Sequence, residues 1–115
     1  VPRARVPDLI RAIEAIAARH GIRCATLGHA GDGNLHPNFI FDRDDPNADK
    51  ITEVARAELY RAAIDLGGTV TAEHGIGAAR RDYLAAQVGE DVVAVMRSIK
   101  NALDPLGILN PGRVL

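Results

Sequence analysis

The chain has 115 residues, a formal net charge of −1, 47% hydrophobic residues and 25% charged residues. This size and composition predict one folded domain and exclude a disordered tail, and no apolar stretch approaches the about 20 residues of a membrane-spanning helix. The small net charge, the two Tyr and the two Phe argue against a nucleic-acid-binding protein. Cys24 is a single cysteine, so an internal disulfide is excluded. With no signal peptide visible, we expect a cytoplasmic protein.

In the first half of the chain, a helical pattern runs from about Asp8 to His20 and is stopped by Gly21. Two strand-like segments follow, Ile22 to Gly28 and Leu35 to Phe41. They are close enough in the sequence to form a hairpin.

The second half begins with a helical pattern from about Asn47 to Leu66 and a short β-branched strand, Gly68 to Ala72. Two more helices are expected, from about Ala78 to Val88 and from Glu90 to Leu103, before an irregular tail rich in Pro and Gly. The stripe of the last helix that is expected to face inward consists of Val92, Val93, Met96, Ile99 and Leu103.

The order α-β-β-α-β-α-α has a hairpin in its middle and helices on either side. This order predicts an α+β fold, with a small antiparallel sheet and helices on one face. Because the expected strands are few, the sheet is predicted to be part of a larger one.

The hairpin carries the first chemical motif, Gly28 to Asn38. Asp32-Gly33 is a strong signal for a two-residue turn, and such a turn places His29 directly opposite His36. Opposed residues point to the same face with Cβ atoms about 4.5–5.5 Å apart, so the two imidazoles can share one metal. A bare histidine pair at this spacing has an alternative interpretation, as structural or merely exposed.

Alternation along the second strand puts Asn38 on the histidine face and Leu35 and Phe39 on the other, in the core. Pro37 lacks an N–H group, so it predicts an edge position or a distorted register.

The second motif is Gly68 to Gly77, where a strand runs into Glu73-His74 and two glycines. Neighbouring residues on a strand face opposite sides, so Glu73 and His74 can serve one site only if the backbone turns, which Gly75 and Gly77 allow. One carboxylate and two imidazoles form an open catalytic metal set.

Other candidate residues have plainer explanations. His20 ends a helix, where a cation suits the dipole, and is predicted to be structural. Cys24 is predicted to be buried and inert. Gly75-x-Gly77 followed by Arg80 makes a poor dinucleotide fingerprint. Arg80-Arg81 is either a solvated basic surface or a guide for an anionic substrate.

Three motifs in order carry a resemblance to a known family. They are Gly28 to His36 (GHAGDGNLH), Ala72 to Gly77 (AEHGIG) and Leu103 to Arg113 (LDPLGILNPGR). Together they closely resemble the C-terminal domain of the FAD-linked oxidases, the group of glycolate oxidase flavin subunits, D-lactate dehydrogenases and D-2-hydroxyglutarate dehydrogenases. The resemblance covers nearly the whole chain.

The resemblance implies that residues 1–115 are the cap or substrate domain of a flavoprotein and form part of a ferredoxin-like α+β cap. An N-terminal domain, absent from this sequence, would hold FAD. Family members oxidise a D-2-hydroxy acid to the 2-oxo acid and pass hydride to the flavin. The partners expected are therefore the protein's own FAD-binding domain or a flavin subunit, and a small 2-hydroxy acid. Any membrane association would come through partner subunits.

The family's functional residues carry over onto matching positions of this chain. The expected ligands of a divalent metal, often zinc, are His29, His36 and Glu73. His74 is expected to be the general base and to contact the substrate, Asn38 to contact the substrate, and Asn110 to lie near the flavin. The family's carboxylate-binding arginine would precede Val1, so the chain alone is expected to be inactive, and many relatives have Lys in place of Arg80.

Two other functional hypotheses remain open at this stage. The chain is either part of such an oxidoreductase or a stand-alone metal-binding module that docks on a separate flavoprotein without catalysis of its own. Metal-dependent hydrolysis would use the same residues with water as the nucleophile. Because a domain cut from its partner exposes an apolar patch, we expect the isolated domain to self-associate.

Overall fold

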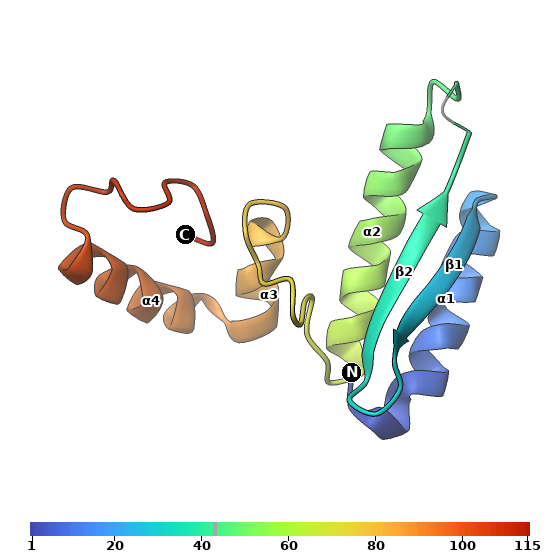
Figure 1. Cartoon of the computed structure of the whole chain (residues 1–115), viewed down its shortest axis with the longest axis horizontal. Coiled ribbons are helices and arrows are strands. Elements are labelled where there is room, and N and C mark those ends of the chain that lie inside the picture. The colour runs from blue at the N-terminus through green and yellow to red at the C-terminus, as the bar shows by residue number, and fades with distance from the viewer. Residues whose placement is uncertain (43) are drawn as a thin grey trace. The chain divides into compact units, whose positions relative to one another are not determined.

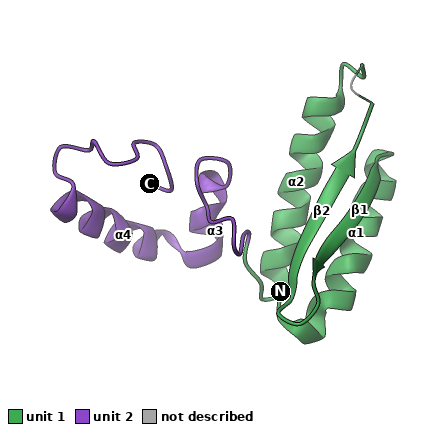
Figure 2. Ribbon diagram, viewed as in Figure 1, with its two compact units in different colours: residues 1–69 green, residues 70–115 purple. Residues whose placement is uncertain are grey.

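The computed structural model describes residues 1–42 and 44–115 of the chain (Figure 1). The contacts divide the chain into two compact units, Val1–Thr69 and Val70–Leu115 (Figure 2). Four α-helices and a two-stranded antiparallel sheet confirm the predicted α+β class. None of the helices in the described ranges is both long and apolar enough to cross a bilayer. The elements are α1 (Val6–His20), β1 (Arg23–His29), β2 (Asn34–Ile40), α2 (Ala48–Asp65), α3 (Leu84–Val88) and α4 (Glu90–Leu103), with 3-10 turns at Arg3–Arg5 and Arg81–Tyr83.

The first unit is built around α1 and α2. Helix α1 starts with Pro7 and Asp8 in its first turn, where the ring and the negative charge are both favourable. It ends where Gly21, at a φ of 65°, adopts the left-handed conformation that glycine accepts without strain. Apolar residues three and four apart face α2 and form the buried core, which consists of Leu9, Ile13, Ile16, Ala55, Leu59 and Ala63.

One face of the β1–β2 hairpin packs against this core. Cys24, Leu35 and Phe39 contact it. On the opposite face, Ala25, Leu27 and Asn38 are exposed and His36 is half-buried. The predicted position of Leu35 and Phe39, and of helices on one face of the sheet, is therefore confirmed. Cys24 is half-buried rather than fully buried. His20 Nε2 lies 3.0 Å from Glu58 Oε1 on α2, so its predicted structural role is confirmed.

The predicted third strand at Gly68 to Ala72 is wrong, because the described sheet contains β1 and β2 alone. The Val70 N–H donates to the side-chain oxygen of Gln87 at 2.9 Å, so this backbone donor is used outside any ladder. A turn follows at once, since the Gly75 N–H donates to the Ala72 carbonyl at 3.1 Å. β-Branched composition alone could not show that the segment's polar groups were committed elsewhere.

The second unit contains the short helix α3 and the longer α4. The third predicted helix begins later than expected, with a 3-10 turn at Arg81–Tyr83 leading into α3. Helix α4 has the predicted bounds, but its apolar stripe is largely exposed. Val93 is buried, whereas Val92, Ile99 and Leu103 are 47%, 56% and 78% exposed, so the prediction that they face inward is wrong.

Candidate metal and substrate site

The turn of the hairpin, which joins the strands that carry His29 and His36, has four residues, Ala30 to Gly33, and not the predicted two. The N–H groups of Asp32 and Gly33 both donate to the His29 carbonyl, at 3.1 and 3.0 Å. The Asp32 carboxylate also accepts the Asn34 N–H at 2.9 Å, and Gly33 takes a φ of 79°. These bonds close the turn between His29 and Asn34, so the predicted two-residue loop is wrong.

The longer turn moves the register by two residues. His29 pairs with Asn34, and His36 pairs with Leu27, so the two histidines are diagonal neighbours and not directly opposed. Because side chains alternate with a period of two, a shift of two leaves every side chain on its predicted face. The two rings lie edge to face, with centroids 5.4 Å apart and planes at 87°. The prediction that both imidazoles share one face is confirmed.

The spacing of these rings fits a shared metal ion. A coordinating imidazole nitrogen lies about 2.0–2.1 Å from zinc, which puts the ring centroid about 3.2 Å from the metal. Two rings that meet one metal at a tetrahedral angle have centroids about 5.2 Å apart, close to the observed 5.4 Å. His29 is exposed and His36 half-buried, so the pair is accessible to an ion from solvent.

Asn38 lies on the same exposed face, as predicted. Its Nδ2 donates to the His36 carbonyl at 2.9 Å and to the Ala25 carbonyl at 3.4 Å, which fixes the side chain across the two strands. Because these contacts use the amide nitrogen, the amide oxygen is the group suited to accept a hydrogen bond from a substrate hydroxyl.

In the second unit, the turn from Ala72 to Gly75 has Glu73 and His74 as its central residues. Gly75 has a φ of 68°, so the backbone turns where the glycine was expected to allow it. As a result the neighbouring side chains reach each other: Glu73 Oε1 lies 3.4 Å from His74 Nε2. Both are more than half exposed, which keeps the pair open to a ligand.

Two side chains that the sequence did not single out for this role support the turn. The Gly75 carbonyl accepts the Thr71 hydroxyl at 2.9 Å and Arg80 Nη1 at 3.3 Å. Arg80 is thus a half-buried structural support and not a solvated charge, whereas Arg81 is exposed. The sequence does show a hydroxyl residue before Glu73-His74 and an arginine after it. It could not show that both donate to the Gly75 carbonyl, because the turn places that carbonyl between them.

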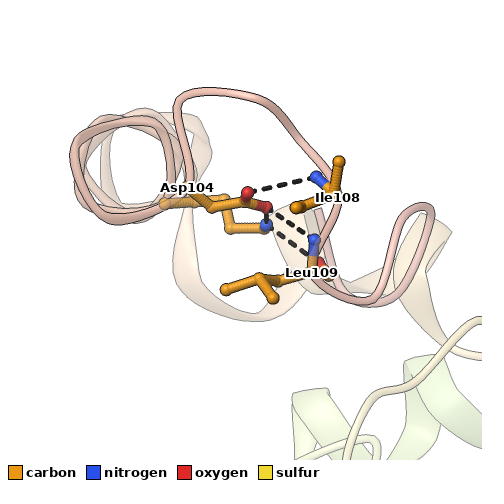
Figure 3. A network of polar contacts seen from close by, with 4 residues as sticks. Asp104, Ile108 and Leu109 are labelled. Carbon is orange, nitrogen blue, oxygen red and sulfur yellow. Dashed lines mark hydrogen bonds and ion pairs between the residues drawn. The ribbon is translucent and has the colours of Figure 1, made fainter.

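The tail that carries Asn110 is held by a buried carboxylate at the end of α4 (Figure 3). Asp104, 6% exposed, accepts the N–H groups of Ile108 and Leu109 at 3.1 and 3.0 Å and binds Lys100 Nζ. The hydrogen bond from Lys100, helped by the two backbone donors, lowers the pKa of Asp104 against the opposing effect of burial. The sequence analysis singled out Asp104 only as part of the third motif, Leu103 to Arg113.

Asn110 itself has a φ of 48°, a left-handed conformation that asparagine tolerates better than most residues. Its carbonyl accepts the Arg113 N–H at 3.1 Å, which closes a turn over Asn110-Pro-Gly. The first unit thus brings together His29, His36 and Asn38, and the second brings together Glu73 and His74. The proximity of Asn110 to a flavin remains a prediction.

Residues 1–114 match the family described as FAD linked oxidases, C-terminal domain. The chain belongs to this family. It is 42% identical over 114 residues to the glycolate oxidase subunit GlcD of Bacillus subtilis (strain 168), covering 99% of this chain and 24% of that protein. It is 43% identical over 114 residues to a mitochondrial D-lactate dehydrogenase [cytochrome] of Kluyveromyces lactis, covering 99% and 19%. It is 33% identical over 113 residues to the glycolate oxidase subunit GlcD of Escherichia coli (strain K12), covering 98% and 23%.

These FAD-linked oxidase relatives are much longer than the region they share with this chain. The chain spans about a quarter of the two glycolate oxidase subunits and about a fifth of the D-lactate dehydrogenase. The family assignment confirms the resemblance carried by the three sequence motifs.

Proposed function

We propose that this chain is the substrate-binding, C-terminal part of an FAD-dependent enzyme that oxidises a D-2-hydroxy acid to the 2-oxo acid. The observation that carries the proposal is the family match over residues 1–114. The names of the relatives support the substrate class, because glycolate and lactate are both small 2-hydroxy acids. The FAD-binding part is carried either on the same polypeptide or on a partner subunit of a cytoplasmic enzyme.

We further propose that His29, His36 and Glu73 hold a divalent metal, with zinc as the first candidate. The ring spacing of the histidine pair supports this ligand set, and the exposed carboxylate of Glu73 supplies the third donor type that such sites use. Two imidazoles and one carboxylate also suit manganese, cobalt and iron. Three protein ligands leave positions for substrate oxygens.

A divalent metal held by His29, His36 and Glu73 would make the substrate hydroxyl more acidic, and bound FAD would serve as the acceptor for the hydride from C2. His74 takes the hydroxyl proton on an imidazole nitrogen, which suits a side chain that changes charge near neutral pH. Asn38 orients the substrate through its amide oxygen. The substrate loses one proton and one hydride, so its C2–O single bond becomes a carbonyl and two electrons pass to the flavin.

The flavin itself provides the direct test. The flavin-loaded protein is mixed without oxygen with glycolate, D-lactate or D-2-hydroxyglutarate, and the loss of flavin absorbance is followed in a stopped-flow instrument. We expect at least one D-acid to reduce the flavin and its L-enantiomer to do so far more slowly. His74→Asn is expected to slow reduction by about 100-fold or more, since general-base catalysis contributes about 10²–10⁴-fold.

A matched control is His20→Asn, because the His20 imidazole contacts Glu58 on α2 and His20 belongs to none of the three motifs. It is expected to leave flavin reduction unchanged. Failure of every 2-hydroxy acid to reduce the flavin would overturn the proposal. Hydrolytic activity that survives removal of the flavin would instead support the metal-dependent hydrolase, and metal binding with neither activity would support the docking module.

A further inference from the structure

Asp104, at the C-terminal end of α4, is a buried carboxylate that the proposed oxidation does not use. Its two oxygens accept the N–H groups of Ile108 and Leu109. Lys100 Nζ binds the same carboxylate and also donates to the Leu109 carbonyl at 2.9 Å (Figure 3). A buried carboxylate stays charged only where partners of this kind satisfy it. These contacts fix the first part of the tail on the end of α4.

The last part of the tail is fixed on the second sequence motif. The Val114 N–H donates to the Gly77 carbonyl at 3.0 Å. Arg81 Nη1 donates to the Gly112 carbonyl at 3.5 Å. Val114 is half-buried and has a φ of 67°, a left-handed conformation that a β-branched residue keeps only where its surroundings impose it. The bond to Gly77 is therefore a defined attachment of the tail.

Residues 104–114 thus form a strap between α4 and the second motif, and the whole strap lies within the second unit. The turn that carries Glu73 and His74 is held from the carbonyls that follow it. The Gly75 carbonyl accepts a hydroxyl and a guanidinium, and the Gly77 carbonyl accepts the strap. Because the side chains of Glu73 and His74 are more than half exposed, their position depends mainly on the backbone that carries them.

We propose that Asp104 is a positioning residue, which holds the strap on α4 and thereby sets the position of Glu73 and His74. Asp104 is buried, so it acts through the strap and not by contact with a substrate. Glu73 and His74 have their metal-binding and proton-accepting roles under the proposed function, on which this inference rests. The alternative is that Asp104 only stabilises the end of α4. Only the first role links Asp104 to the turn in the folded protein.

Amide hydrogen exchange on the complete flavoprotein tests this link without any substrate. Asp104→Asn removes the charge that Lys100 binds and one of the two oxygens that accept the tail amides. In this variant we expect peptides covering residues 72–77 and 108–114 to exchange at least about tenfold faster, because their hydrogen bonds open more often. Val93→Ala is the matched control, since it shortens a buried side chain of the same helix outside the strap. It should leave exchange at residues 72–77 within about twofold of the parent.

Flavin reduction gives the readout that a purely structural role would not move. At a saturating D-2-hydroxy acid, Asp104→Asn should slow reduction by about tenfold or more, because small displacements of reacting groups are costly, whereas Val93→Ala should not. Faster exchange confined to residues 108–114, or equal effects of the two variants, would overturn the proposal. If no 2-hydroxy acid reduces the flavin of the parent, the proposed function fails, yet the exchange measurement still decides whether Asp104 holds the turn.

Arg81→Met keeps the proposal testable if Asp104→Asn does not fold. Arg81 donates to the strap at Gly112, and its side chain is 48% exposed, so its removal leaves the interior intact. We expect residues 72–77 to exchange about threefold faster or more in this variant. Arg97→Met removes the same charge from an exposed position of α4 and should leave this exchange unchanged. Equal exchange in the two variants would show that the strap does not hold the turn.

Discussion

Two imidazoles on neighbouring strands are the residues on which the metal hypothesis depends. Their ring spacing suits one shared ion, so removing both should remove the ion. In protein purified without chelator or affinity tag, we expect about one metal equivalent per chain, and less than about a tenth of that in His29→Ala/His36→Ala. Plasma mass spectrometry measures the metal directly.

His20→Ala is the matched control for the metal measurement. It removes an imidazole of the same unit that contacts Glu58 instead of facing the pair, so its metal content should equal that of the parent. Metal that persists in the double variant would refute the hairpin site. Metal that is lost from Glu73→Gln as well would support the third ligand.

A second residue-scale prediction concerns the titration of Asp104. Its pKa is lowered in the folded state, mainly by the hydrogen bond from Lys100, so the unfolded chain binds the proton more readily. The carboxylate therefore contributes stability that is fully present above the unfolded pKa of about 3.9 and is lost as the pH falls through the lower folded value. The amide chemical shifts of Ile108 and Leu109, which donate to this carboxylate, should titrate with a midpoint below that of an ordinary aspartate.

Asp104→Asn provides the comparison for this titration. It keeps the side-chain size but removes the charge, so the two amide shifts should become independent of pH below about 5, a range in which ordinary carboxyl groups titrate. A wild-type midpoint at or above the ordinary aspartate value would contradict the role given to Lys100.

At the scale of single elements, the hairpin turn offers a sharp comparison between two glycines. Gly33 has a φ of 79°, and a Cβ there would lie 1.9 Å from the Val1 carbonyl oxygen, whereas a Cβ at Gly31 would meet nothing within 4 Å. We expect Gly33→Ala to lower the free energy of unfolding by about 1 kcal/mol or more, and Gly31→Ala to change it by less than about 1 kcal/mol. Urea titration of both variants measures the difference. Equal effects would refute the turn geometry.

The hairpin also shows how far sequence reasoning reaches for an element. The alternation of apolar residues at Leu35 and Phe39 correctly predicted which face of the hairpin is buried. This prediction holds although the predicted turn was two residues too short. The turn length was missed because the Asp32 carboxylate accepts the Asn34 N–H, which stabilises a longer turn than the Asp-Gly pattern predicts. The buried face of a strand follows from the alternation of apolar and polar residues along it. The pairing register of the hairpin follows instead from the hydrogen bonds made within the turn.

The bounds of α1, α2 and α4 were predicted better than the environment of α4. Periodicity and caps gave α4 its residues 90–103, because those signals are local. The apolar stripe of α4 does not by itself indicate which part of the protein packs on it. In the structure, Ile99 and Leu103 of this stripe are largely exposed. The false strand at Gly68 to Ala72 has a similar cause, since the partner of the Val70 N–H is Gln87, which is distant in the sequence.

At the scale of the whole molecule, several large apolar side chains are exposed in each of the two units. On α4 and the tail, Leu103 and Leu106 are 78% and 80% exposed, and on β1 Leu27 is 69% exposed. Contiguous exposed apolar surface is typical of a contact with another part of a protein. The fold therefore leaves apolar side chains exposed on both units, as a surface that packs against another part of a protein does.

We predict that the isolated chain self-associates. In size-exclusion chromatography with light scattering, we expect its mass to rise above that of one chain as the concentration increases, because apolar surface leaves water when copies meet. Ile99→Lys/Leu103→Lys should reduce this rise, since both side chains are more than half exposed on α4. Ala94→Lys/Asn101→Lys adds the same charge to exposed positions of the same helix without removing a large apolar side chain. If both double variants suppress association equally, net charge and not the apolar stripe governs it, and a chain that stays monomeric at all concentrations refutes the prediction.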